Sequence, residues 1–295
     1  MILVTGATGT VGSEVITALL PTQAGRLRAL TRNPGAVFPD GVQKIVADLG
    51  DSDPTPVLDG VRAVFLLTEG LHIAAHDHRL VAAARRTGVE RIVKLSVRNV
   101  GHGATDPITA LHRAGEDALR DSGIGWTFLR PTAFMSNALD WAGMIAAGQV
   151  VYAPFAGGRA AVVDPADIAA VAAACLTQDG HEHRVYELTG PEPLSPSEQV
   201  AILGQVLGRD LRYTEADPAD TLARMVSYGM PEELAHAVIE LFRSTEEPYN
   251  SEPTGDVTAV TGRPARGFAD WARAHRDEFP APETVRNAAT IEESR

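Results

Sequence analysis

Three glycines spaced three residues apart follow directly on a short apolar run at the start of the chain. The run is Ile2–Val4, the glycines are Gly6, Gly9 and Gly12, and a helical pattern of apolar residues continues from there. Strand, glycine turn and helix in this order bring backbone N–H groups onto a pyrophosphate. Gly6 allows the tight turn, Gly9 lets a phosphate approach, and Gly12 lets the helix pack close to the strand. The sequence therefore predicts a dinucleotide-binding unit at its start.

Composition narrows the class of protein. The chain has 295 residues, of which 44% are hydrophobic and 22% charged, as in soluble globular proteins. Its formal net charge of −12 disfavours nucleic acid or an anionic membrane as a partner. No apolar run reaches membrane-spanning length, and Met1 already begins the first strand, so we expect a cytoplasmic protein. Cys175 is the single cysteine, which rules out a disulfide within the chain and predicts a buried, inert thiol.

Strand and helix patterns alternate over the first two thirds of the chain. Apolar runs predict strands over 26–31, 42–47, 61–67, 91–96, 126–129 and 185–188. Helical periodicity predicts helices over 72–87, 106–121 and 133–147, and a further helix that begins after Asp164 as its N-cap and Pro165. Repeated β-α units with right-handed crossovers give an α/β fold, a Rossmann-like doubly wound parallel sheet covered by helices on both faces.

The regular alternation of strand and helix patterns ends after Pro131. Short strands are expected near Val150 and Ala160, and past Gly190 helical patterns cover 196–207, 218–227, 231–243 and 265–275. We expect residues 1–190 to form the NAD(P)-binding domain, including part of the cleft. Residues 191–280 would form a smaller, mostly helical substrate lobe, and residues 281–295 a polar tail that frays.

Several stretches along the chain resemble one family. They are Thr5–Gly12, Arg32–Pro34, Ala47–Leu49, Arg91–Ser96, His112–Glu116 and Thr127–Asn137. In this order and spacing they resemble the atypical short-chain dehydrogenase/reductases, and within them the NmrA-like proteins and NAD(P)H:quinone oxidoreductases. The resemblance spans about residues 1–190 and continues more loosely through 268–279. It implies a Rossmann fold, a nicotinamide dinucleotide and a small-molecule substrate, in a monomer or homodimer.

The resemblance also implies which residues hold the cofactor. Carried over onto this sequence they are Gly6, Thr8, Gly9, Thr10, Val11, Arg32, Asp48, Leu49, Leu67, Thr68, His112, Pro131 and Phe134. Cofactor choice can be argued from charge. A site that reads the 2′-OH of NAD usually has a carboxylate at the end of the second strand, whereas this chain has Thr31 and Arg32 there. Because a guanidinium offers several donors to a 2′-phosphate, we expect NADP(H) rather than NAD(H).

The catalytic positions depart from the usual pattern of the larger family. Ser96 stands where the family has its serine, but the tyrosine position holds Ile108 and the lysine position His112. Without the phenol the usual proton relay to a carbonyl oxygen is absent. Hydride transfer to a quinone gives a delocalised anion that water or a histidine can protonate. Ser96 and His112 are therefore the expected catalytic residues. Two roles stay open for His112, binding the ribose or donating a proton near neutral pH.

Other polar and aromatic residues are candidates for the substrate cleft. His72 lies in the loop expected beside the nicotinamide, and Asn137, Tyr152 and Phe155 lie where the sheet should meet the lobe. His72 and His76 are one helical turn apart, a spacing that can bind zinc, but no cysteine or carboxylate pattern completes a site. We expect no metal.

These observations favour an NADPH-dependent oxidoreductase that transfers a hydride to a quinone-like or conjugated carbonyl compound. Two alternatives stay open because the catalytic tyrosine is missing. NmrA-like regulators resemble this chain and sense NADP(H) without turnover. A specialised-metabolite isomerase or cyclase on the same fold is the other alternative.

Overall fold

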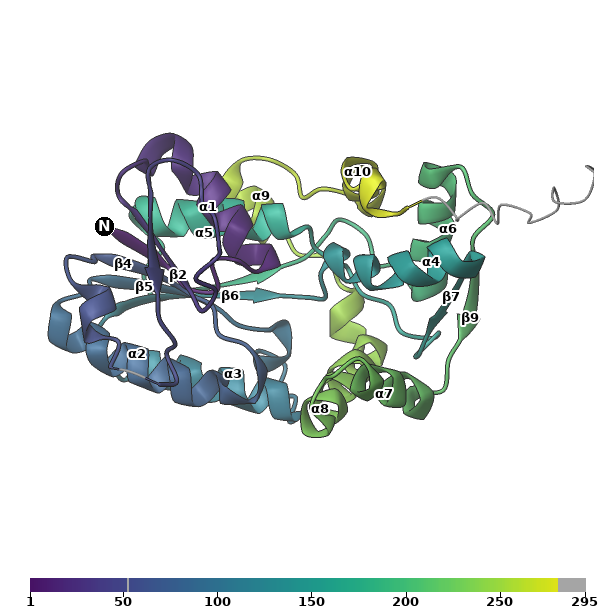
Figure 1. Ribbon diagram of the computed structural model, residues 1–295, viewed down its shortest axis with the longest axis horizontal. Coiled ribbons are helices and arrows are strands. Elements are labelled where there is room, and N and C mark those ends of the chain that lie inside the picture. The colour runs from purple at the N-terminus through teal and green to yellow at the C-terminus, as the bar shows by residue number, and fades with distance from the viewer. Residues whose placement is uncertain (52, 281–295) are drawn as a thin grey trace, which may run out of the picture.

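The computed structural model describes residues 1–51 and 53–280, and its centre is a seven-stranded parallel sheet (Figure 1). The expected tail, residues 281–295, lies outside the described residues. The strands follow the order β3-β2-β1-β4-β5-β6-β8. Their bounds are β1 Ile2–Val4, β2 Leu27–Thr31, β3 Val42–Val46, β4 Ala63–Leu66, β5 Arg91–Leu95, β6 Gly125–Pro131 and β8 Arg184–Leu188. The predicted doubly wound sheet is confirmed.

Burial explains why the inner strands form where the apolar runs are. β1 and β4 are buried along their whole length, because helices cover both faces of a parallel sheet. β3 lies at one edge, and its residues are half-buried or exposed. β1 lies between β2 and β4, with Val4 in register with Ala29 and Phe65. The loops that leave the carboxyl ends of β2, β1 and β4 are therefore neighbours.

Helices form a layer on each face of the sheet (Figure 1). On one face α1 (Thr10–Gln23) packs against α5 (Pro165–Thr177), and α9 (Asp256–Thr261) packs on α5. On the other face α2 (Ile73–Thr87) packs against α3 (Pro107–Arg120). α5 begins as predicted, since the Asp164 carboxylate accepts the Ala166 N–H at 2.8 Å and Pro165 is the first helical residue.

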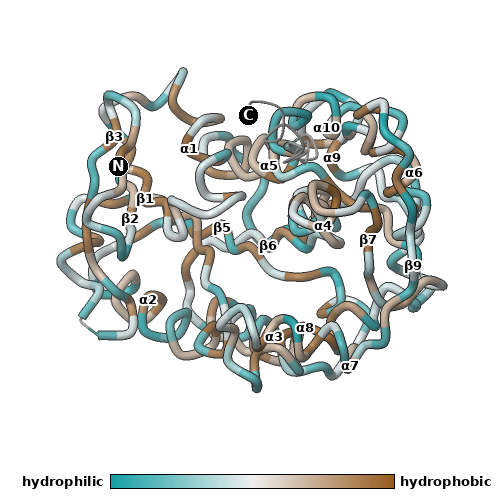
Figure 2. Tube along the Cα trace, turned by 45° about the vertical axis from the view of Figure 1, so that its right-hand side comes forward, coloured by the Kyte–Doolittle hydropathy of each residue, from teal (hydrophilic) through white to brown (hydrophobic). Residues whose placement is uncertain are grey.

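A smaller, mostly helical lobe lies beyond the carboxyl ends of the strands (Figure 1). It contains α4 (Ala142–Gly148), α6 (Pro196–Leu207), α7 (Pro218–Ser227), α8 (Glu232–Arg243) and α10 (Phe268–Ala274). Two short parallel strands, β7 (Val150–Ala153) and β9 (Arg212–Glu215), form a second sheet. The hydrophobic core of the lobe contains residues from both sides of position 190, among them Met135, Ile145, Leu203 and Trp271. Figure 2 shows α8 beside α3, and the two helices are in contact.

The structure differs from the sequence prediction in four places, three of them in the lobe. The single helix expected over 133–147 is wrong: residues Met135–Trp141 form a 3₁₀ helix, and α4 starts only at Ala142. Ser136, Asn137 and Asp140 hold back a regular helix there, because such side chains compete for backbone hydrogen bonds. The strand expected near Ala160 is a single antiparallel bridge to Leu194. β9 and α9 had no counterpart in the prediction. Over residues 1–51 and 53–280, no helix combines the length and the apolar character needed to cross a bilayer.

Candidate active site

The glycine turn after β1 is shaped by contacts that leave no room for side chains. Gly6 has a φ of +59°, and a Cβ there would lie 2.6 Å from Leu67 Cδ2. A Cβ on Gly12 would collide with the backbone carbonyl of Gly6. The turn and the first turn of α1 therefore pack backbone against backbone, and the predicted reasons for Gly6 and Gly12 hold.

The amino end of α1 is open to an anion. Its N-cap is Gly9, which offers no side-chain cap, and the first turn carries no acidic residue. Thr8 and Thr10 are exposed beside it, whereas Val11 is buried. α3, α5, α6 and α7 begin with an Asp or Ser that caps a backbone N–H, whereas α2, α4, α8, α9 and α10 lack a side-chain cap, as α1 does. The 14-residue α1 thus presents free N–H groups and the positive end of its dipole at the glycine turn.

The loop after β4 is held by hydrogen bonds to Thr5 after β1 and to Asp77 on α2. The Thr5 hydroxyl donates to the Leu67 carbonyl at 2.8 Å and accepts the Leu67 N–H at 2.7 Å. The next residue, Thr68, donates its hydroxyl proton to Asp77 Oδ1 at 2.8 Å. Leu67 and Thr68 are both half-buried, and Leu67 borders the glycine turn.

The loop after β2 carries Arg32, whose guanidinium pairs with Glu69 at 2.9 Å. Both side chains are largely exposed, at 68% and 74%. The backbone around Arg32 is held by an Asn33 side chain that accepts the Gly35 N–H at 2.8 Å. Sequence reasoning placed Glu69 in the loop beside the nicotinamide but had no signal for its pairing with Arg32, because the pair joins two loops that are distant in sequence.

The loop after β3 holds the next two predicted cofactor residues. The Asp48 carboxylate accepts the Gly50 N–H at 2.7 Å, which fixes the bend after the strand. Leu49 is buried and belongs to the hydrophobic core beneath α2. At the end of β6, Pro131 is buried and Phe134 is half-buried, bridged through its backbone to Val163.

Ser96 lies in a buried charged cluster under α3. Its hydroxyl donates to Glu116 Oε1 at 2.7 Å. Arg130 donates to both oxygens of the same carboxylate, at 2.9 and 2.6 Å, and Arg120 reaches it from the edge at 2.8 Å. Glu116 is wholly buried and Ser96 is 2% exposed. The Ser96 hydroxyl proton is therefore used in a hydrogen bond to the buried Glu116 carboxylate.

His112 lies one helical turn before Glu116 and is 7% exposed. Its Nδ1 is buried without a hydrogen-bond partner among the described residues. Burial, and then the nearby positive charge of Lys94, lower the pKa of His112 well below its ordinary value. The imidazole is consequently neutral at pH 7, with one nitrogen that donates and one that accepts.

Lys94 itself forms an ion pair that the sequence analysis missed. Its Nζ lies 2.6 Å from Asp77 Oδ2, and both side chains are fully shielded from solvent. Gly115 makes the space, since a Cβ at that position would collide with the Asp77 carboxylate. A signal was present for both residues. Lys94 interrupts the apolar run of β5, and Asp77 stands on the apolar stripe of α2 between Ile73 and Leu80.

The four predicted substrate residues occupy different parts of the lobe junction. His72 is exposed at the end of a 3₁₀ turn, with its ring 5.8 Å from that of His76. Asn137 is exposed, and Tyr152 on β7 is 44% exposed. Phe155 is buried, with the Arg243 guanidinium 5.1 Å from its ring centre. Within the described residues no group of three or more His, Cys, Asp or Glu side chains is placed to hold a metal ion.

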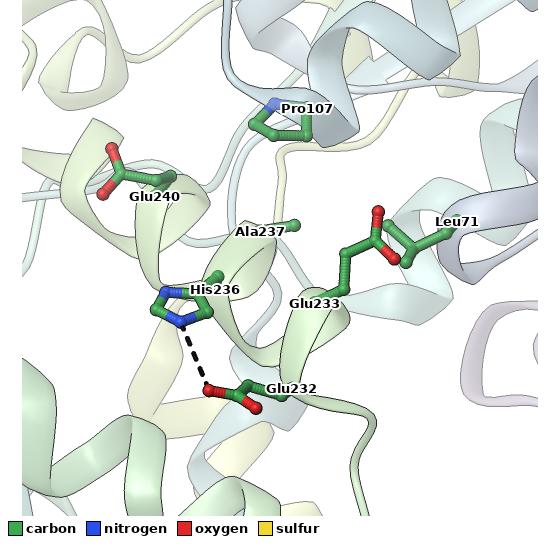
Figure 3. A pocket seen from close by; sticks show the side chains of 7 residues that line it. All are labelled: Leu71, Pro107, Glu232, Glu233, His236, Ala237 and Glu240. Atoms are coloured by element: carbon green, nitrogen blue, oxygen red, sulfur yellow. Dashed lines mark ion pairs between the residues drawn. The ribbon is translucent and has the colours of Figure 1, made fainter.

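A pocket of about 510 Å³ lies where α8 meets the loop after β4 and the first residue of α3 (Figure 3). Leu71, Pro107 and Ala237 give it apolar walls, and Glu232, Glu233 and Glu240 give it carboxylates. His236 lies 4.0 Å from Glu232 along the same helix. The pocket places α8 of the small lobe opposite the carboxyl end of the large sheet.

Comparison with known families and proteins agrees with this geometry. The model of the NmrA-like family matches residues 1–276. A (4-alkanoyl-5-oxo-2,5-dihydrofuran-3-yl)methyl phosphate reductase of Streptomyces griseus is 44% identical over 289 residues, which cover 96% of this chain and 100% of that protein. An NAD(P)H azoreductase of Xenophilus azovorans is 36% identical, over 95% of this chain and 100% of its own.

A solved structure has the same architecture. The NADPH-dependent quinone oxidoreductase of Escherichia coli, complexed with NADPH, superimposes with a TM-score of 0.81 at 29% identity. The match covers 94% of this chain and 100% of that one. The small lobe is therefore included in the similarity, together with the large sheet.

Proposed function

Because the chain belongs to the NmrA-like family, we propose that it is an NADPH-dependent oxidoreductase that passes a hydride to a quinone-like or conjugated carbonyl compound. The family expected from the sequence motifs is confirmed. Two relatives that match over their full length, at 44% and 36% identity, are named as a reductase of an oxo-dihydrofuran phosphate and an NAD(P)H azoreductase. The observation that carries the proposal is the uncapped α1 terminus beside the glycine turn.

The nucleotide fits this turn for physical reasons. The free N–H groups of α1 would take the pyrophosphate, and the absence of a side chain at the exposed N-cap Gly9 would let it approach. Arg32 would take the 2′-phosphate through charge-assisted hydrogen bonds, because it projects from the end of β2 with most of its side chain in solvent. Thr8, Thr10, Asp48 and Leu49 would complete the adenosine side.

The nicotinamide side would be formed by residues from β4, α3 and β6. Leu67 borders the turn and is followed by Thr68. Pro131 ends β6, and Phe134 lies three residues further on. NADPH, when bound, supplies the hydride. The neutral state of His112 favours the ribose-binding role over proton donation, since an imidazole with a lowered pKa holds no extra proton to give near pH 7.

The choice of acceptor follows from the groups that remain for proton transfer. Ile108, at the position of the family tyrosine, is buried and has no acidic proton. The Ser96 hydroxyl donates to Glu116. An acceptor whose negative charge is delocalised after hydride transfer can take its proton from water, so quinones and conjugated carbonyl compounds suit this site better than isolated ketones.

The test is acceptor-dependent oxidation of NADPH by the purified protein, followed by the absorbance of the reduced nicotinamide. A panel of quinones and conjugated carbonyl compounds should support turnover, and a saturated ketone of similar size serves as the control. NADPH binding without turnover of any acceptor would overturn the proposal in favour of a sensing protein. Conversion of a redox-neutral substrate without net NADPH consumption would favour an isomerase or cyclase.

We further propose that the protein works in the cytoplasm as a monomer or homodimer. Residues 1–190 would form the nucleotide-binding domain and part of the cleft, and residues 191–280 would cover the substrate. The pocket between α8 and the carboxyl end of the sheet supports the second assignment. Light scattering of the purified protein with and without NADPH would give its oligomeric state. A larger assembly would contradict the proposal.

A further inference from the structure

The ion pair between Arg32 and Glu69 joins the two loops that flank the glycine turn. Arg32 follows β2 and Glu69 follows β4, the two strands that flank β1 on either side. The turn of Gly6–Gly9 leaves the end of β1 between them. A bond of 2.9 Å between the two side chains therefore joins the loops on either side of the turn.

Both ends of this bridge come from anchored loops. The backbone before Glu69 is tied down through Leu67, which bonds to Thr5, and through Thr68, which bonds to Asp77. The Asn33 turn anchors the backbone beside Arg32. The two charged side chains are exposed, so they can rotate away while their backbones stay in place.

We propose that Glu69 is a specificity-determining residue for the nucleotide: its carboxylate competes with the 2′-phosphate of NADPH for Arg32. The inference rests on the proposed function, in which Arg32 binds that phosphate. NADPH must exchange the Glu69 carboxylate for its own phosphate, and the two anions repel each other near Arg32. NADH has no such phosphate and leaves the ion pair intact. Glu69 thus lowers the factor by which the protein binds NADPH more tightly than NADH.

The size of the effect follows from the exposure of the pair. An exposed ion pair of this kind contributes little, which corresponds to about a two- to fivefold change in a binding constant. We expect Glu69→Gln to tighten NADPH binding by about that factor and to leave the dissociation constant for NADH unchanged. The ratio of the two dissociation constants, measured by calorimetry at one fixed ionic strength, is the readout.

The chain offers a matched control. Glu90 pairs with Arg62 at 2.7 Å, also between exposed side chains, but these residues precede β5 and β4 at the opposite end of the sheet. Glu90→Gln removes the same charge and should leave the ratio unchanged. An equal change of the ratio in both variants would show that the effect comes from the net charge of the protein, and it would overturn the inference.

A second pair of variants tests whether Glu69 acts through Arg32. In an Arg32→Ala background, Glu69→Gln should change the ratio less than it does in the wild-type background. An undiminished change in that background, or weaker NADPH binding by Glu69→Gln alone, would contradict competition for the guanidinium. Failure of the wild-type protein to bind either nucleotide would instead overturn the proposed function. Binding with a ratio that Glu69→Gln leaves unaltered would overturn only this inference.

Discussion

The carboxylate of Asp77 on α2 and the ammonium of Lys94 on β5 meet at 2.6 Å with no solvent access to either side chain. This buried pair connects several parts of the site. The same carboxylate accepts the Thr68 hydroxyl from the loop after β4, and the charge of Lys94 helps to keep His112 neutral. The helix layer over the site thus packs on two buried charges as well as on apolar side chains.

Loss of one member of this pair should be costly. Lys94→Met leaves the Asp77 carboxylate buried without its counter-charge, and we expect a loss of about 3–5 kcal/mol in the free energy of unfolding. The other lysine, Lys44, is exposed on β3, where it donates to two backbone carbonyls. Lys44→Met should therefore change stability by less than about 1 kcal/mol. Urea unfolding of both variants measures the difference, and similar losses would contradict a structural role for the buried pair.

Gly12 should tolerate no side chain. Gly12→Ala sets a Cβ against the Gly6 carbonyl, so the turn must open, at an expected cost of about 1–3 kcal/mol and with weaker NADPH binding. Gly143→Ala is the matched control, because it also lies near the start of a helix and a Cβ there meets open space. It should be neutral or stabilising by up to about 1 kcal/mol. Thermal unfolding with and without NADPH distinguishes the two, and an unchanged Gly12→Ala protein would refute the packing argument.

His112 should make the protein sensitive to acid. Its pKa is lowered by folding, so below about pH 6.5 the unfolded chain binds a proton that the folded protein does not. Stability then falls as pH falls, by up to about 1.4 kcal/mol per pH unit from this residue. His112→Gln should flatten the slope of stability against pH below pH 6.5. Equal slopes for wild type and His112→Gln in urea unfolding would show that His112 is protonated in the fold.

Arg32 should decide between the two nucleotides. Arg32→Asp removes the charge-assisted bonds to the 2′-phosphate and adds repulsion, so NADPH should bind about 10- to 100-fold more weakly. NADH, which lacks that phosphate, should be affected far less. Arg85→Asp, at an exposed position in the last turn of α2, is the control for a general charge effect. Equal losses for both nucleotides in Arg32→Asp would refute the assignment.

Cys175 should be unreactive in the folded protein. It is 1% exposed, and burial raises the pKa of its thiol to about 12. At pH 8 the thiolate, which is the reactive form, is scarce. We expect no alkylation by iodoacetamide in buffer and one equivalent in denaturing urea, measured by intact mass. Rapid modification of the folded protein would mean that α5 opens readily.

The sequence predicted the large sheet well, because its inner strands are continuous apolar runs followed by helical patterns. The cap at Asp164 was also predictable from local residues alone. β9 was missed because its residues are exposed or half-buried and carry no apolar pattern. The break in the expected helix at residue 142 depends on polar side chains that compete with the helix, which a periodicity argument weighs too lightly.

The candidate site was predictable only in part. Ser96 and His112 were named from their positions in family motifs. In the structure the Ser96 hydroxyl bonds to Glu116, and His112 lies one turn before Glu116 on α3. The carboxylate that holds the Ser96 hydroxyl and the pairing of Asp77 with Lys94 depend on how helices face the sheet. The spacing of charges along the chain does not give those distances. The bridge from Arg32 to Glu69 has the same origin, since it joins loops that only the strand order brings together.

The small lobe shares its core between segments on both sides of the large sheet's last strand. Residues before β8, such as Met135 and Ile145, pack with residues after it, such as Leu203 and Trp271. The chain thus leaves the sheet, returns through α5 and β8, and leaves again. A chimera of two relatives that is joined at a single point would take the two halves of this core from different proteins. Such a chimera would therefore disrupt the core when substrate preference is exchanged. A functional chimera needs at least two crossover points that move both segments of the lobe together.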